Sequence, residues 1–117
     1  MSQSTGRQNS KTQRPDILRT LSDDKAFYFY NGIDAPLGVK ANNLAEFALK
    51  VGNVSPTCVE FHVKRHDFEN WIKMLGDVTL AEQIMAIGSK GLPPSQSQQQ
   101  LAKTVKLRLS DIKKKSK

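Results

Sequence analysis

The sequence has little of what catalysis, metal binding or covalent cross-linking needs. Its 117 residues include one cysteine, Cys58, which excludes an internal disulfide framework and cannot alone form a structural zinc site. The two histidines, His62 and His66, follow Cys58 at intervals of four residues. That spacing would align three ligands on a helix but separates neighbours by ~13 Å on a strand. No G-x-S-x-G, P-loop or G-x-G-x-x-G pattern occurs. We therefore expect no catalytic residue, metal site or cofactor.

Long apolar runs are also missing. The sequence has no stretch of 18 apolar residues and no charged-then-apolar leader, so we expect neither a membrane span nor secretion. Hydrophobic residues make up 38% of the chain, below the usual globular range, which indicates that part of it lies outside a core. The length allows one domain. We expect a small cytoplasmic protein.

Basic residues, by contrast, are in excess and concentrate at the two ends. Eighteen lysines and arginines face eleven acids, which gives a net charge of +7. Residues 1–20 carry +3, residues 21–91 carry −2 and residues 92–117 carry +6. A polyanionic partner would therefore be attracted by the ends of the chain and not by its middle.

Composition divides the chain at the same places. Residues 1–14 have no large apolar side chain after Met1, and residues 88–100 combine glycine, tandem proline, serine and glutamine. All eight aromatic residues lie between Phe27 and Trp71. We predict four parts: a disordered basic tail at 1–20, a core domain at 21–91, a linker at 92–100 and a basic segment at 101–117.

Within the core, hydrophobic spacing predicts a mixed α+β fold. Strands are expected at 26–30 and 37–41, the first with Phe27 and Phe29 on one face and Tyr28 and Tyr30 on the other. Helices are expected at 43–51, capped by the Asn43 and Glu46 pair, at 67–75, capped by Asp67, and at 79–87, opened by Thr79.

Two further segments complete the prediction. Residues 57–65 alternate between apolar and polar, which favours a strand, although Ser55-Pro56 also suits the start of a helix. Residues 105–109 fit an edge strand, and the longer stretch 101–112 fits a helix equally well. The expected fold is a small antiparallel sheet of about four strands with helices packed on its Phe face, and flexible basic tails.

The open face of such a sheet suggests a binding surface. Tyr28 and Tyr30 would lie there, surrounded by basic side chains from neighbouring β-strands. Bases of a single-stranded nucleic acid stack on such rings while cationic groups contact the phosphates. Trp71 shares an apolar helical stripe with Phe68 and is expected in the core, with stacking at the edge of a groove as the alternative. The candidate contacts on the sheet are Tyr28, Tyr30, Lys40, His62, Lys64 and Arg65.

The basic residues of the C-terminal segment would add contacts with phosphates, which do not depend on the nucleotide sequence. Dense lysine clusters bind phosphate backbones through counterion release. The candidate residues are Lys106, Arg108, Lys113, Lys114 and Lys115.

The stretch from Glu60 to Ile84 follows the pattern EFH-x4-DF-x2-WI-x3-GD-x2-LA, preceded by NLAEFALKV at 43–51. It resembles a small domain of archaeal and some bacterial proteins, in the neighbourhood of the ThermoDBP-type single-stranded DNA-binding proteins. The resemblance covers residues 26–87. It implies a sheet-and-helix domain with a cleft of aromatic and basic residues that binds single-stranded DNA, and it implies self-association.

The leading hypothesis is a non-enzymatic protein that binds single-stranded DNA, or RNA, with little sequence preference. The alternative is a protein–protein interaction or regulatory module whose tails only solubilise it. A third reading is an architectural protein that binds duplexes with its tails. A homodimer stays open at this stage.

Overall fold

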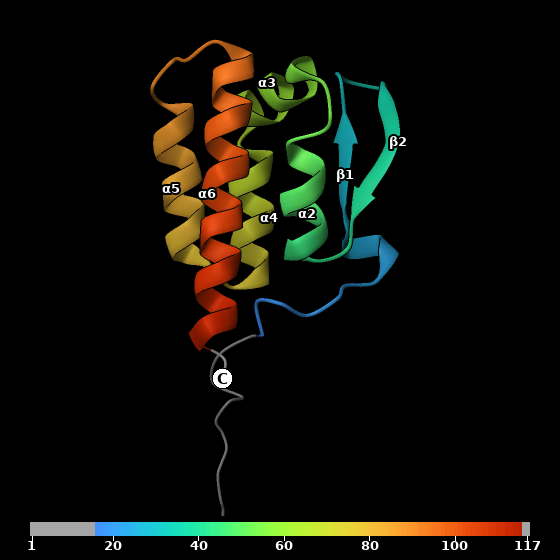
Figure 1. Cartoon of the computed structure of the whole chain (residues 1–117). Helices are drawn as coiled ribbons and strands as arrows, with labels where there is room; N and C mark the ends of the chain where they lie inside the picture. Colours follow the sequence, from blue (N-terminus) through green and yellow to red (C-terminus); the bar gives the residue numbers. More distant parts are fainter. Residues whose placement is uncertain (1–15, 116–117) are drawn as a thin grey trace, which may run out of the picture.

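The computed structural model describes residues 16–115. Within them, five α-helices lie on one side of a two-stranded β-hairpin (Figure 1). The fold is thus α+β but mainly helical, and the expectation of about four strands is wrong. In chain order the elements are η1 (Asp23–Lys25), β1 (Phe27–Tyr30), β2 (Pro36–Ala41), α2 (Leu44–Val51), α3 (Pro56–Arg65), α4 (Asp67–Leu75), α5 (Val78–Gly88) and α6 (Pro94–Lys115).

The hairpin has the predicted faces. β1 and β2 are antiparallel, with Tyr28 opposite Lys40 and Phe29 opposite Val39. Phe27 and Phe29 are buried against the helices, whereas Tyr28 is 44% exposed. The register shifts between Phe29 and Tyr30, where Leu37 and Gly38 of β2 are left without a partner on β1.

Helix α2 confirms its predicted cap. The Asn43 side chain accepts a hydrogen bond from the Glu46 backbone N–H at 2.8 Å. Glu46 Oε1 in turn accepts from the backbone N–H of Asn42, also at 2.8 Å. Leu44, Phe47, Ala48 and Val51 are buried. Asn43 therefore caps the helix as the sequence predicted, while Glu46 binds the backbone of the residue before the cap.

The caps of the two following helices differ from prediction. Asp67 is the first residue of α4 and not its cap, because His66 occupies the cap position with φ 62°. Helix α5 begins at Val78, and Asp77 caps it by accepting from the Leu80 N–H at 3.1 Å. Thr79 therefore lies inside the helix. Gly76 ends α4 with φ 108°, a left-handed conformation that glycine adopts at least cost.

The predicted strand at 57–65 is helix α3. Ser55 caps it by accepting from the Cys58 N–H at 3.2 Å, and Pro56 occupies its first turn. Cys58, Val59 and His62 are buried, at positions i, i+1 and i+4. The apolar alternation was misleading because nine residues satisfy both periods, and burial against other elements selected the helical one.

The predicted linker at 92–100 and the choice between strand and helix at 101–112 are both resolved by α6. Pro94–Lys115 is one helix whose glutamine-rich start packs on the body. The buried Gln98 amide donates to the carbonyls of Val51 at 3.0 Å and Val54 at 2.6 Å. Leu101 and Val105 are fully buried. Side-chain hydrogen bonds to the end of α2 thus anchor a segment that has little apolar surface of its own.

The expected N-terminal tail also extends too far. Within it, residues 16–20 belong to the folded part, since Ile17 and Leu18 pack against the core. Arg19 Nη1 donates to the Leu75 carbonyl at 2.9 Å. Residues 1–15, the Lys115 side chain and residues 116–117 lie outside the described part.

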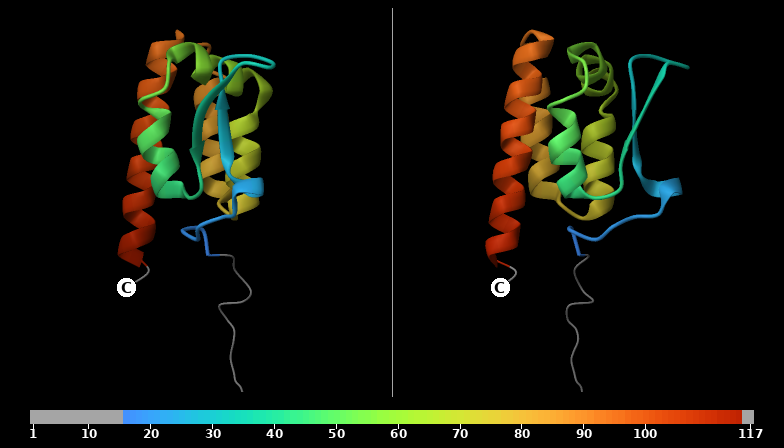
Figure 2. Two further views of the ribbon diagram at one scale, coloured as in Figure 1. Left: turned by 90° about the vertical axis from the view of Figure 1, so that its right-hand side faces the viewer. Right: turned by 45° about the vertical axis from the view of Figure 1, so that its right-hand side comes forward.

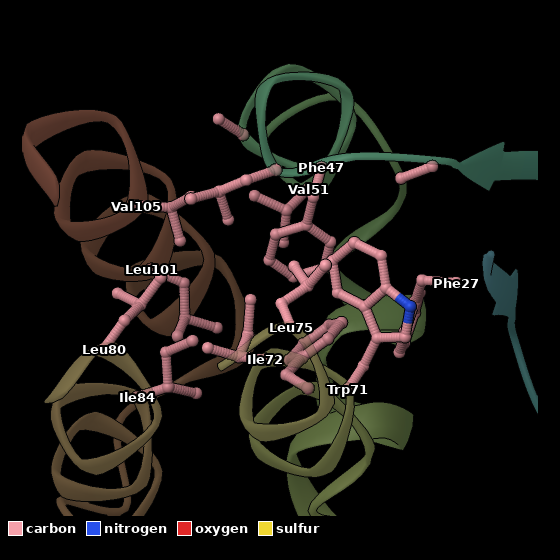
Figure 3. Packing of buried hydrophobic residues seen from close by; sticks show 14 of the residues in the cluster. Phe27, Phe47, Val51, Trp71, Ile72, Leu75, Leu80, Ile84, Leu101 and Val105 are labelled. Carbon is pink, nitrogen blue, oxygen red and sulfur yellow. The ribbon is translucent and has the colours of Figure 1, made fainter. Parts of the chain in front are cut away.

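The helices form the middle and one side of the molecule and the hairpin forms the other. Figures 1 and 2 show α5 and α6 side by side, α2 and α4 between them and the hairpin, and α3 across the top. One continuous core runs through these layers, from Phe27 of β1 and Trp71 of α4 to Leu80 of α5 and Val105 of α6 (Figure 3). None of the helices in the described region is long and apolar enough to cross a membrane.

Candidate ligand-binding groove

A groove of about 640 Å³ opens between the hairpin and helices α3 and α4. Its lining contains five aromatic rings, which come from three elements: Phe27, Tyr28 and Tyr30 on β1, Phe61 on α3 and Trp71 on α4. Ile33, in the hairpin turn, and Met74 also line it, and both are exposed. We call this site the hairpin groove.

The two tyrosines both line the groove, whereas the sequence analysis placed them together on the open face of a sheet. The Tyr28 hydroxyl donates to the Asp23 carbonyl, which holds the exposed ring at the edge of β1. Tyr30 is half-buried, with its ring centroid 6.5 Å from that of His62. The rings therefore offer an exposed face at one position and a partly covered one at the other.

His62 was predicted on the open face of a sheet, but it is buried. It is 3% exposed because α3 is a helix whose inner side carries it. Its Nε2 accepts from the Tyr30 backbone N–H at 2.9 Å, and its Nδ1 lies 2.8 Å from Asp67 Oδ2. Because Nε2 must accept, the ring is neutral with its proton on Nδ1, which donates to Asp67.

Burial reinforces that neutral state. Loss of hydration lowers the pKa of His62, and the hydrogen bond with Asp67 only partly opposes the effect. His62 thereby connects the end of β1 to the start of α4 and forms part of the groove wall. Its role here is to position the aromatic rings.

Arg65 also lines the groove, from the last turn of helix α3 and not from the strand on which it was expected. Its guanidinium carbon is 5.2 Å from the centroid of the Phe61 ring, and its Nε donates to Asp67 Oδ2 at 3.1 Å. Its side chain is 54% exposed. The stacked guanidinium is therefore held on the rim by two neighbours while its other donors face solvent.

Of the two lysines expected beside the tyrosines, only Lys40 lies there, opposite Tyr28. Lys40 is beside Tyr28 but pairs with Asp23 at 2.7 Å, a contact that raises the pKa of Lys40 and lowers that of Asp23. Lys64 pairs with Glu60 at 3.4 Å and lies by Val63 and Gly88, outside the groove. Since Asp34 and Asp67 line the groove with Arg65, its own charge is slightly negative.

The basic residues of α6 lie on another part of the molecule. Arg108 is not available as a phosphate contact, because its Nε and Nη2 donate to the buried Asp77 carboxylate at 2.7 and 3.0 Å. Lys106, Lys113 and Lys114 are exposed on α6. Figure 1 places that helix on the side opposite the hairpin, so the two predicted sets of contacts form separate surfaces.

Sequence reasoning missed several residues of the groove. Phe61, Asn70 and Met74 line it although nothing in their spacing set them apart. Trp71 was expected in the core, where it lies at 8% exposure, and its Nε1 donates to the Lys25 carbonyl at 2.9 Å. Trp71 also lines the groove, which is the position that the sequence analysis kept as its alternative.

No group of three histidine, cysteine or acidic side chains within residues 16–115 is placed to hold a metal ion. Burial raises the pKa of the Cys58 thiol to about 11. His66 lies past the end of α3, where its Nδ1 is 2.9 Å from Glu69 Oε2. The three residues at four-residue intervals therefore have separate partners.

Comparison with known proteins gave no match to a protein-family model, to a curated protein or to a solved structure. The EFH-x4-DF-x2-WI-x3-GD-x2-LA pattern does have a structural meaning in this chain. His62 and Asp67 bond to each other, Phe68, Trp71 and Ile72 are core, and Gly76 and Asp77 form the turn and cap between α4 and α5. Most of the pattern therefore specifies the fold.

Proposed function

We propose that the protein binds single-stranded nucleic acid, with bases of the strand stacked in the hairpin groove. The observation that supports this proposal is the convergence of Tyr28, Tyr30, Phe61 and Trp71, from three elements, on one groove open to solvent. Stacking of a base on an aromatic ring contributes roughly 1–3 kcal/mol and tolerates any sequence. The activity is non-enzymatic, and the resemblance to ThermoDBP-type proteins favours DNA as the ligand.

Discrimination against a duplex follows from the shape of the site. Rings inside a groove can stack only on bases that are unpaired and turned outward. Arg65, on the rim, is the group best placed to contact a phosphate, since its side chain is half-exposed and stacked on Phe61. Because the groove itself is slightly acidic, stacking and not charge provides its selectivity.

Fluorescence anisotropy with a labelled oligothymidylate tests this proposal. The double variant Tyr28→Ala, Phe61→Ala removes two rings, and a loss of about 1 kcal/mol at each predicts a roughly 30-fold weaker affinity. The matched control is Met85→Ala on α5, an exposed residue that does not line the groove. Equal affinity of a folded double variant and the parent would show that the rings do not bind the strand.

Docking of a protein segment is the second candidate. Ile33 is 77% exposed and Met74 40% exposed at the same groove, beside the acidic Asp34 and Asp67. An apolar, basic peptide would match these groups better than a phosphate backbone does. If no oligonucleotide binds even at low salt, the aromatic groove is better explained in this way.

A further inference from the structure

Helix α6 presents a row of lysines on the side that faces away from the bundle. Lys103, Lys106 and Lys114 are exposed, whereas Leu101 and Val105 on the opposite side are buried. At 3.6 residues per turn the three lysines fall within an arc of about 80° and extend over ~16 Å of the helix. We call these three residues the α6 stripe.

The stripe keeps its charge available for a ligand. None of the ion pairs found in the described part of the chain uses any of these three lysines. The single acid on α6 is Asp111. Lys106 and Lys114 also line one shallow hollow with Lys113, and Lys103 and Lys106 line the next one along the helix. The positive groups are therefore contiguous.

The chemistry of the stripe differs from that of the hairpin groove. Helix α6 contains no aromatic residue, so it cannot stack on bases and can recognise only a charged backbone. Duplex DNA carries one charge per ~1.7 Å, so about ten phosphate charges lie within the length of the stripe. A single strand carries about half that density. A duplex backbone is thus the nucleic acid that the stripe attracts most strongly.

The two surfaces lie on opposite sides of the molecule. In Figure 1 and in the right view of Figure 2, α2 and α4 lie between α6 and the hairpin. Helices pack at 8–10 Å from one another, so roughly 20 Å separates the hairpin from the α6 axis. The nucleotides of a single strand that are bound in the groove therefore cannot contact the stripe. A ligand bound at one surface does not block the other surface.

We propose that the α6 stripe is a second nucleic-acid surface, which binds a duplex backbone while the hairpin groove holds a single strand. One molecule then joins an unpaired strand to a neighbouring duplex, as at the junction between them. The joining step rests on the proposed function of the groove, but duplex binding by the stripe does not.

Two triple variants of the full chain separate a specific stripe from general positive charge. Lys103→Gln, Lys106→Gln, Lys114→Gln removes the stripe. Lys25→Gln, Lys64→Gln, Lys73→Gln removes the same charge from exposed lysines away from α6. Each phosphate contact contributes about 0.9 to the slope of log affinity against log salt. For a labelled 20-base-pair duplex, we expect the stripe variant to lose nearly 3 from that slope and the control variant to keep it.

Equal loss of slope in both triple variants would overturn the stripe, because net charge alone would then account for duplex binding. Energy transfer between a labelled duplex and a labelled oligothymidylate measures the joining step. We expect transfer with the parent and its loss in the stripe variant, with oligothymidylate affinity unchanged. If the groove proposal fails, oligothymidylate does not bind, yet the duplex slopes still decide the stripe. Transfer between two oligothymidylates would indicate self-association as the cause of joining and would overturn the two-surface arrangement.

Discussion

Replacing Arg108 by glutamine is expected to destabilise the protein, although sequence reasoning placed this residue on a nucleic-acid surface. Its guanidinium forms two hydrogen bonds with Asp77, at 2.7 and 3.0 Å, and the Asp77 side chain is only 1% exposed. In the variant, the buried carboxylate keeps the Leu80 N–H and loses its charged partner. The contact also ties α6 to the start of α5.

The magnitude follows from the burial of the pair. Breaking a buried ion pair costs 3–5 kcal/mol, and the lower end applies because the Arg108 side chain is 22% exposed. We expect the free energy of unfolding to fall by about 3 kcal/mol. With a urea m-value of about 1.5 kcal/mol/M, the unfolding midpoint moves down by about 2 M.

Trp71 fluorescence in urea is a suitable assay, since this single tryptophan packs against Phe27 and Phe47 and unfolding exposes it. The control Lys106→Gln, on the exposed side of α6, is expected within about 0.5 kcal/mol of the parent. Asp77→Asn keeps a good helix cap without charge, so adding it to Arg108→Gln is expected to recover part of the loss. If Arg108→Gln matched the Lys106→Gln control, the reasoning about the buried pair would be refuted.

Two further predictions concern buried titratable groups. Since burial lowers the pKa of His62, the unfolded chain binds a proton below pH 6.5 that the native protein does not. Stability is therefore expected to be full above that pH and to fall below it, by up to about 1.4 kcal/mol per pH unit, until the native pKa is reached. Urea midpoints at several pH values check this, and a profile shared by the parent and His62→Gln would contradict it. Cys58, with its pKa raised to about 11, is expected to hold about 200-fold less thiolate at pH 8 than an ordinary cysteine. Labelling by a disulfide reagent would then accompany unfolding, and native protein that reacts as fast as the unfolded chain would disprove it.

The best-predicted elements are those with both a stop signal and a single hydrophobic period. Helix α2 matched within one residue because Asn43 and Glu46 cap it and Gly52 ends it. Helix α4 matched because Phe68, Trp71, Ile72 and Leu75 fit a helix and nothing else. The prediction for helix α3 was wrong because residues 57–65 fit both the strand period and the helix period. A linker was wrongly predicted at the start of α6, because Gln98 is held there by hydrogen bonds to carbonyls 44 and 47 residues away in the sequence.

The candidate site was predicted in part for the same reason. Tyr28 and Tyr30 lie on one strand, so alternation alone paired them. Arg65 lines the groove because its segment is a helix and not the predicted strand. Lys40 and Lys64 form ion pairs with nearby acidic side chains. The error at His62 came from the wrong secondary structure of its segment, since a helix turned inward the residue that a strand would have exposed.

By itself the sequence determined the local features: where α2, α4 and α5 lie, which face of β1 is buried, and how charge divides between the ends and the middle. These depend on residues within a few positions of each other, where spacing and capping act directly. Only the tertiary structure decided that α3 is a helix, that Arg108 is structural and that the aromatic groove and the α6 stripe lie on opposite sides. Those outcomes depend on contacts such as Tyr30 with His62 and Arg108 with Asp77, which join residues more than 30 positions apart.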